Sequence, residues 1–427
     1  MTMTKTVWGQ VREQLGDIGK IEVLVGIPTF NNAKTVEPVV NAVKAGLSKV
    51  CPPASVVVVN ADAGSQDGTP ETIKQAAGPD IRTAFVQHLA DGFFPGPISL
   101  HALSESGVPG REHAFRAFFT VAEELQVQAC VVVDANLRSL TSDWMEVLLR
   151  PVIEKGVDFV APLFRRARYE GSLTNCIIYP LSRALYGKQM RYQSGGGYGF
   201  SGKLASLYLT KNVWEGEGAH YGIDSWLTTV AVAESCEVSQ GFLGTKIHDG
   251  TLTGIELSLL LAQAVGALFH LMEAYQDVWE GSTGSSPVPQ FGPPYEPGPE
   301  GGAVNVERMV RGFQQGLRDL LPIWEIILAP ETLAGILPLG LVEAEEFRFP
   351  AALWVQTIYD FALAYHEKAL YREHLLKSLT PLYLGRTASL VLETRAGTPE
   401  DVERVIETLC ETFERMKPYL TQRWRFS

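Results

Sequence analysis

Short apolar runs alternate with amphipathic stretches through the first 250 residues of the chain. The runs lack a polar face, which predicts strands buried on both sides, at 21–27, 55–59, 130–133 and 158–161. The stretches between them predict helices at 34–48, from residue 70 onward and at 112–125. Strands alternating with helices are typical of crossover connections. The fold class that we predict is therefore α/β with a mostly parallel sheet.

The pattern changes after residue 280. Residues 281–303 hold six Pro and six Gly in 23 positions, which predicts a long loop or linker. Beyond it, amphipathic patterns at 304–321, 351–370 and 399–419 predict helices, with little strand signal. We therefore predict an α/β domain at 1–250 and an all-helical C-terminal region at 251–427 that contains this loop.

Composition narrows the class of protein. A formal net charge of −12 argues against a general nucleic-acid binder. The five cysteines are scattered, so neither a disulfide framework nor a CxxC metal site is expected. The polar N-terminus predicts no signal peptide, and the apolar stretch at 257–272 is interrupted by Gln263 and His270, which favours a buried helix over a membrane span. We expect a cytoplasmic protein without a membrane partner.

Asp134 and Asn136 follow the apolar run 130–133 directly. In open α/β sheets, ligands bind just beyond the carboxyl ends of the strands. Carboxylate and amide oxygens suit a hard divalent cation, which often carries a diphosphate. The alternative is a simple turn, which Asp and Asn also favour.

Three more polar segments follow a strand or open a helix in this part of the chain. Residues 28–31 (Pro28, Thr29, Phe30, Asn31) end the first predicted strand, and residues 62–69 end the second, where the Asp62 carboxylate can bond a base or ribose. Arg111 opens a helix, where free backbone N–H groups and the helix dipole favour phosphate. Each segment could also be an ordinary turn or helix cap. Together they stand in the order expected of a nucleotide site.

At this point the chain resembles the GT-A glycosyltransferases. That family has a Pro-containing loop after its first strand, an Asp-x-Gly-Ser-x-Asp-Gly-Thr-like segment (here 62–69) and an Asp-x-Asp motif (here 134–136). More narrowly, it resembles the retaining enzymes of compatible-solute synthesis, the glucosylglycerate, mannosylglycerate and glucosyl-3-phosphoglycerate synthases. The matching segments are 110–114, 171–175, 221–224 and 246–248. The resemblance implies a GT-A, Rossmann-like fold.

The resemblance also implies roles for individual residues. The donor nucleotide would contact Pro28, Thr29, Phe30, Asn31, Asp62, Arg111, Asp134 and Ala135, and the sugar would contact Gly196, Gly197, Tyr221 and Asp224. The acceptor would contact Arg165, Arg166, Arg168, Ser172 and Thr174, and Mn or Mg would bind Asp134, Asn136 and His248. Asp224 and Arg111 would be the catalytic residues.

Three of these assignments have a plain structural alternative. His248 could be a satisfied structural histidine rather than a ligand, although neutral imidazole can join oxygens around a metal. Asp224 could cap the helix predicted at 225–233. The arginines at 165, 166 and 168 could be a solvated surface run rather than forks that capture an acceptor carboxylate or phosphate.

The chain departs from the family pattern at two positions. Asn136 replaces the second Asp of the metal motif, and Gly197 stands where the group tends to carry a glutamate. We expect an enzyme that transfers a hexose, glucose rather than mannose, from a nucleoside-diphosphate sugar to glycerate or 3-phosphoglycerate, working as a homodimer. The alternatives are a GT-A enzyme with a lipid or protein acceptor and a catalytically silent sugar-nucleotide sensor.

Overall fold

The chain divides into two compact units, and each is described by itself. The computed structural model describes residues 2–17, 19–88, 107–191, 195–211, 222–247, 257–296, 298, 301–302 and 304–425. The α/β unit consists of Met1–Phe164, Tyr192–Gly254 and Val288–Tyr295, and the helical unit consists of Arg165–Arg191, Ile255–Pro287 and Glu296–Ser427. A single boundary at residue 250 is therefore not what the structure has, because residues 165–191 fold with the helices and residues 288–295 fold with the sheet.

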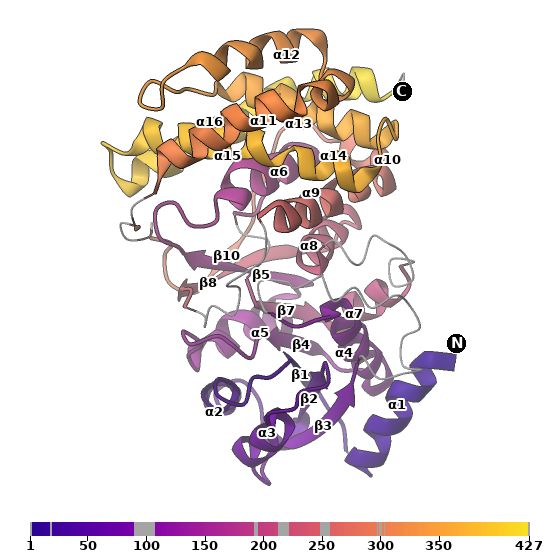
Figure 1. Cartoon of the computed structure of the whole chain (residues 1–427). Coiled ribbons are helices and arrows are strands. Elements are labelled where there is room, and N and C mark those ends of the chain that lie inside the picture. Colours follow the sequence, from indigo (N-terminus) through magenta and orange to yellow (C-terminus); the bar gives the residue numbers. More distant parts are fainter. Residues whose placement is uncertain are drawn as a thin grey trace. The chain divides into compact units, whose positions relative to one another are not determined.

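An eight-stranded sheet forms the centre of the α/β unit, in the order β10-β8-β5-β7-β4-β1-β2-β3 (Figure 1). Its strands are β1 (Val23–Thr29), β2 (Val56–Asp62), β3 (Arg82–Gln87), β4 (Ala129–Val133), β5 (Phe159–Arg165), β7 (Gly197–Ser201), β8 (Val238–Thr245) and β10 (Gln290–Phe291). β1 pairs in parallel with β2 and β4, whereas β7 runs antiparallel to β4 and β5. The mostly parallel α/β sheet is confirmed.

Helices cover both faces of this sheet, which explains why its strands are continuously apolar. They are α1 (Thr2–Leu15), α2 (Val36–Leu47), α3 (Thr69–Ala77), α4 (Arg111–Leu125), α5 (Asp143–Lys155), α7 (Gly202–Leu209) and α8 (Ile223–Ala233). Val25 of β1 belongs to the core that α2 and α5 share, on one face. Gly26 faces α4 on the other, where an added Cβ would lie 2.7 Å from the Phe118 ring. Neither face of β1 is left to solvent.

The connections place a topological switch point beside β1. The chain proceeds from β1 to β2 and β3 on one side, and β4 pairs with the other side of β1. Ligands in open α/β sheets bind at such a point, outside the carboxyl ends of the strands. Thr29 and Asp62 are the last residues of β1 and β2, and Asp134 follows β4. Three of the predicted site residues therefore lie together at the carboxyl ends of these strands.

β3 is the outermost strand at one side of the sheet, and a side chain bonds to its outer backbone groups. The carboxamide of Gln14 in α1 donates to the Phe85 carbonyl at 2.8 Å and accepts from the Phe85 amide at 2.8 Å. One side chain thus makes both hydrogen bonds that a neighbouring strand would make there.

The helical unit contains α6 (Tyr179–Tyr186), α9 (Leu257–Ala274), α10 (Gln276–Gly281), α11 (Val306–Ile327), α12 (Pro330–Ile336), α13 (Ala351–His366), α14 (Arg372–Ser378), α15 (Thr380–Thr394) and α16 (Pro399–Trp424). A helical C-terminal region is therefore confirmed. The Pro/Gly-rich stretch is less of a linker than predicted, because it contains β9 (Ser286–Pro287), which pairs with β6 (Lys188–Gln189), as well as β10.

Among the described helices, α9 is long and apolar enough to cross a membrane by length and composition, and half of it is buried inside the structure. It packs against α13 and α14 within the helical unit. This packing agrees with the predicted core helix.

Candidate functional site

Arg111 opens α4 and faces two carboxylates. Gly110 precedes it with a left-handed φ of 60° and gives the helix no side-chain cap. The Nη1 atom of Arg111 lies 2.8 Å from Oδ1 of Asp134 and 3.0 Å from Oδ2. Its Nη2 atom lies 3.6 Å from Oδ1 of Asp224. One guanidinium therefore joins the end of β4 to the first turn of α8.

This cluster of charges is largely shielded from solvent. The side chains of Arg111 and Asp134 are 3% and 7% exposed, and that of Asp224 is 17% exposed. Burial alone would lower the pKa of Arg111, but the carboxylates of Asp134 and Asp224 outweigh it and hold that pKa above its ordinary value. The guanidinium neutralises two carboxylates, and the predicted contact of Arg111 with a diphosphate stays a prediction.

Gly196 lies against the Asp134 side chain. Its carbonyl accepts a hydrogen bond of 2.9 Å from the Asp134 amide, and its φ of +83° suits glycine. A Cβ at this position would lie 2.3 Å from Oδ2 of Asp134. Gly197 is also confined, since its Cβ would meet the Trp144 ring at 3.2 Å. Gly196, a predicted sugar contact, is therefore beside Asp134, a predicted metal ligand.

Asp224 is held by a tyrosine that sequence reasoning did not select. The hydroxyl of Tyr198, in β7, donates to Oδ1 of Asp224 at 2.6 Å. Asp224 is the second residue of α8, and the cap position belongs to Gly222, so the helix-cap alternative for Asp224 is wrong. Tyr198 directly follows the glycine segment, but nothing in the local sequence distinguishes it from an ordinary strand residue.

The residues predicted to hold a metal are only partly described. Asp134 and Asn136 are 5% and 3% exposed, and the buried Oδ1 of Asp134 accepts no hydrogen bond in the described part of the structure. The amides of Arg138 and Ser139 donate to the Ile247 carbonyl. This bond brings the chain just before His248 to the loop that contains Asn136. His248, like Tyr221, lies outside the described residues.

Carboxylate and amide oxygens at this loop are the ligand types that Mn and Mg prefer. The described residues contain no group of three His, Cys, Asp or Glu side chains that could hold a metal. The oxygen donors of Asp134 and Asn136 fit a hard cation, and the predicted third ligand, His248, lies outside the described residues.

The Asp62 carboxylate is fully used within its own turn. Its Oδ1 accepts from the hydroxyls of Thr29 and Ser65, at 2.7 and 2.6 Å. Its Oδ2 accepts from the amides of Gly64 and Ser65, at 2.9 and 2.6 Å. A carboxylate has about four acceptor positions. A base or ribose would have to displace one of these donors, so the nucleotide contact of Asp62 stays a prediction.

The loops after β1 and β2 are joined to each other. Asn31, which has a left-handed φ of 54°, donates its amide to the Ser65 hydroxyl and accepts from the Gln66 amide. Phe30, just before it, is half-buried. Burial would raise the pKa of Asp67, but hydrogen bonds from Thr69 and from the Ala33 amide outweigh it and lower that pKa. The predicted donor loop is thus preformed.

His88 extends β3 at the same end of the sheet. Its amide donates to the Asp62 carbonyl, and its Nε2 lies 3.0 Å from the Pro109 carbonyl. Because that carbonyl can only accept, Nε2 carries the proton, and the buried Nδ1 has no hydrogen-bond partner among the described residues. Burial lowers the pKa of His88 to about 4. This histidine is therefore neutral at ordinary pH.

The predicted acceptor residues belong to the helical unit and differ in surroundings. Arg165 is 38% exposed and pairs with Glu296 at 3.2 Å. Arg168 is buried and donates to the carbonyls of Thr394, the last residue of α15, and Gly397. The solvated-run alternative is therefore wrong for Arg168, and the acceptor role of all three arginines stays a prediction.

The other two predicted acceptor residues are Ser172, which bonds to another side chain, and Thr174, which is buried. The Ser172 hydroxyl contacts that of Tyr383. Thr174 is buried and begins a π-helical turn, Thr174–Ile178, in which Asn175 accepts from Arg191 at 2.7 Å. Single π-helical turns are rare in proteins, and those that occur are often found at functional sites.

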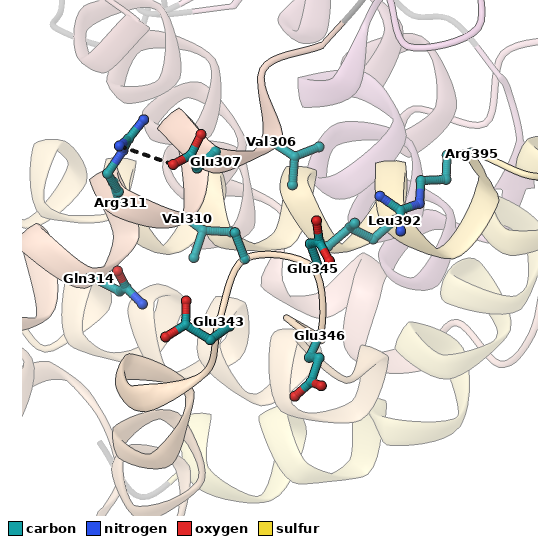
Figure 2. Close-up of a pocket in the computed structure, with 11 residues that line it drawn as sticks. Val306, Glu307, Val310, Arg311, Gln314, Glu343, Glu345, Glu346, Leu392 and Arg395 are labelled. Atoms are coloured by element: carbon teal, nitrogen blue, oxygen red, sulfur yellow. Dashed lines mark ion pairs between the residues drawn. The ribbon is translucent and has the colours of Figure 1, made fainter.

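A cavity of about 760 Å³ in the helical unit has the wrong charge for an anionic substrate (Figure 2). Four glutamates line it, and one of them, Glu307, pairs with Arg311. Two arginines, Arg311 and Arg395, also line it, so the four glutamates outnumber the cations. No predicted site residue is among the lining residues.

Comparisons with known proteins find solved structures that match part of the chain. No family model matches, and no curated protein is significantly similar. Glucosyl-3-phosphoglycerate synthase from Mycobacterium tuberculosis, in complex with Mn²⁺, UDP-glucose and phosphoglyceric acid, is 18% identical, with 65% of this chain and 84% of that chain covered and a TM-score of 0.43. Its complex with Mg²⁺ and UDP is 18% identical, with 64% and 83% covered and a TM-score of 0.43.

These structures belong to the group of enzymes that the sequence resembles. A likeness at this identity and TM-score carries no argument about activity.

Proposed function

We propose that this chain is a hexosyltransferase that moves a hexose, glucose rather than mannose, from a nucleoside-diphosphate sugar to glycerate or 3-phosphoglycerate with retention. The observation that carries the proposal is the cluster of Arg111, Asp134 and Asp224 at the switch point of the sheet. Two carboxylates held by one buried cation suit a site where charge is rearranged during the reaction. The sequence resemblance supplies the choice of sugar transfer.

The donor would lie across the carboxyl ends of β1, β2 and β4. The joined loops after β1 and β2 would hold the nucleoside, and the start of α4 would face the diphosphate, because free N–H groups at a helix start favour anions. Asp134, Asn136 and His248 would hold Mn or Mg, which when bound neutralises a departing diphosphate. Asp224 would face the sugar and stabilise positive charge at its anomeric carbon.

The acceptor would be an anion, because Arg165, Arg166 and Arg168 stand just before the segment that resembles the family's acceptor loop. Arg165 is 38% exposed and already pairs with the Glu296 carboxylate, the kind of group that an acceptor acid would present. In a chain of net charge −12, an anion needs such a local basic group. A cytoplasmic location and a homodimer remain predictions.

One observation favours the second candidate, a sugar-nucleotide sensor without turnover. Arg111 contacts both oxygens of Asp134, and position 136 adds an amide instead of a carboxylate. The Arg111 contact and the missing carboxylate would both weaken metal binding. The loops after β1 and β2, which would hold the nucleoside, would be unaffected.

Turnover measurements separate the two candidates. The chain is incubated with UDP-, GDP- or ADP-glucose and the corresponding mannose donors, with glycerate or 3-phosphoglycerate, and with Mn²⁺, Mg²⁺ or EDTA. We expect release of nucleoside diphosphate that depends on acceptor and metal and is lost in Asp224→Asn. Stabilisation by the nucleotide in a thermal-shift assay without any acceptor-dependent release would favour the sensor.

A further inference from the structure

The hydroxyl of Tyr198 is fixed in position by its surroundings. Tyr198 is fully buried, and its ring stacks on Phe159 at a centroid distance of 6.1 Å and meets the Phe115 ring edge-on at 6.2 Å. It pairs with Val132 of β4, two residues before Asp134. Aromatic packing on both sides and strand pairing leave the phenol one orientation.

The hydrogen bonds of this hydroxyl define where its proton points. The Gly195 amide donates to the Tyr198 oxygen at 3.3 Å, so the oxygen accepts there. The 2.6 Å bond to Oδ1 of Asp224 is then the one to which Tyr198 donates. Burial, and then the Asp224 charge, raise the pKa of Tyr198 well above its ordinary value, so the proton stays on the phenol.

Asp224 therefore has two rigid supports on one oxygen, the Tyr198 hydroxyl and the Arg111 guanidinium. Arg111 is itself fixed by Asp134 and lies 5.2 Å from the centre of the Phe115 ring. Asp224 is the member of the cluster with the largest exposed fraction, at 17%. The cluster therefore holds Asp224 while leaving part of its side chain exposed.

We propose that Tyr198 is a positioning residue for Asp224, an inference that rests on the sugar-transfer function proposed above. Tyr198 does not touch substrate. It holds the carboxylate in the orientation that meets the donor sugar, so that its loss slows the chemical step and leaves nucleotide binding intact.

The test compares Tyr198→Phe with a matched variant. Tyr208→Phe removes another fully buried tyrosine hydroxyl from the same aromatic cluster, one that donates to the Leu227 carbonyl at 2.7 Å. Both variants keep the ring. Tyr198→Phe loses the bond to Asp224 and the longer one from the Gly195 amide, and Tyr208→Phe loses the bond to the Leu227 carbonyl. We measure kcat, the donor KM and the stoichiometry of UDP binding.

In Tyr198→Phe we expect kcat to fall about ten- to a hundredfold, the range for one hydrogen bond to a charged group, with the donor KM and the UDP stoichiometry unchanged. Tyr208→Phe should keep the wild-type kcat. Because Tyr198 acts only through Asp224, its defect should not exceed that of Asp224→Asn.

A wild-type kcat in Tyr198→Phe would overturn the proposal, and so would a fall in kcat matched by a fall in UDP stoichiometry, which signals lost folded protein. An equal loss in Tyr208→Phe would also overturn it. Absence of turnover in the wild-type chain would instead overturn the proposed function, and this inference with it.

Discussion

Arg111 and Asp134 form a buried ion pair in which a single guanidinium nitrogen, Nη1, reaches both carboxylate oxygens, at 2.8 and 3.0 Å. The pair joins the start of α4 to the residue after β4. Removing one partner of such a pair leaves the other charge buried without compensation, which costs far more than an exposed pair contributes.

We therefore expect Arg111→Met to lower the free energy of unfolding by about 3–5 kcal/mol, the usual cost of leaving one buried charge alone. Urea unfolding followed by tryptophan fluorescence measures this. Arg150→Met is the control, because Arg150 is 44% exposed and its partners, Glu146, Glu154 and the Lys49 carbonyl, are all surface contacts. Similar stability in the two variants would mean that Asp134 finds another partner.

Gly196→Ala should disturb Asp134 as well as the backbone. A left-handed φ at a residue other than glycine costs about 1–3 kcal/mol, and the added Cβ would also meet Oδ2 of Asp134 at 2.3 Å. Gly156→Ala has the same backbone problem at φ +71° but meets nothing within 4 Å. We expect Gly196→Ala to lose UDP and Mn²⁺ affinity in titration calorimetry, and Gly156→Ala to keep both. Equal affinities would show that the Asp134 side chain moves aside without consequence.

His88 should make stability fall in mild acid. Its folded pKa of about 4 lies below the ordinary 6.5, so the folded state disfavours the protonated ring. The stability that the neutral ring contributes is fully present above pH 6.5 and is lost as the pH falls toward 4. Between pH 6.5 and 5 the loss is about 2 kcal/mol.

His88→Gln keeps a donor for the Pro109 carbonyl and should remove this part of the pH dependence, seen by urea unfolding at pH 7 and pH 5. The exposed His374, changed to Gln, is the control. If His88→Gln loses as much stability between pH 7 and pH 5 as the wild type, then other groups cause that loss.

Arg165 and Arg168 should respond differently to substitution, although three positions separate them. Arg168→Met leaves the Thr394 and Gly397 carbonyls without their donor and should destabilise the protein by about 1–3 kcal/mol. Arg165→Ala should leave stability unchanged and raise the acceptor KM about ten- to a hundredfold, with the donor KM unaltered. Thermal unfolding and steady-state kinetics with glycerate and 3-phosphoglycerate separate these effects. If Arg165→Ala has normal kinetics, the acceptor site lies elsewhere.

Position 136 should control the affinity for metal. Asn136→Asp restores a second carboxylate beside Asp134 and should tighten Mn²⁺ binding, while His248→Ala should weaken it about tenfold or more, equivalent to about 1.4 kcal/mol. Titration of Mn²⁺ in the presence of UDP measures both, with His374→Ala as the control. Unchanged affinity in His248→Ala would remove His248 from the ligand set.

The sequence predicted the strands better than their ends. The first strand was expected to stop before Pro28, which lacks an N–H, but β1 continues to Thr29. Its pairing with β4 ends at Gly26, and beyond that residue only β2 is alongside. Because one side of β1 is unpaired there, a residue without an N–H fits.

The site was predictable where its residues follow strands and not where it depends on distant packing. Asp134 and Asp62 were found because a polar residue after a buried run is a local pattern. Tyr198 looks like an ordinary strand residue, and only the fold brings its hydroxyl to Asp224, 26 residues away along the chain. The assignment of residues 165–191 to the helical unit also depends on long-range contacts, which a local pattern does not contain.

The Gln14 side chain that bonds to Phe85 bears on the solubility of this protein. An open sheet edge offers unpaired N–H and C=O groups to strands of other molecules, and this is a common start of aggregation. Here a single carboxamide occupies one pair of those groups. The N-terminal helix therefore helps to keep separate molecules from joining through their sheets. This role is unrelated to any chemistry at the carboxyl ends of the strands.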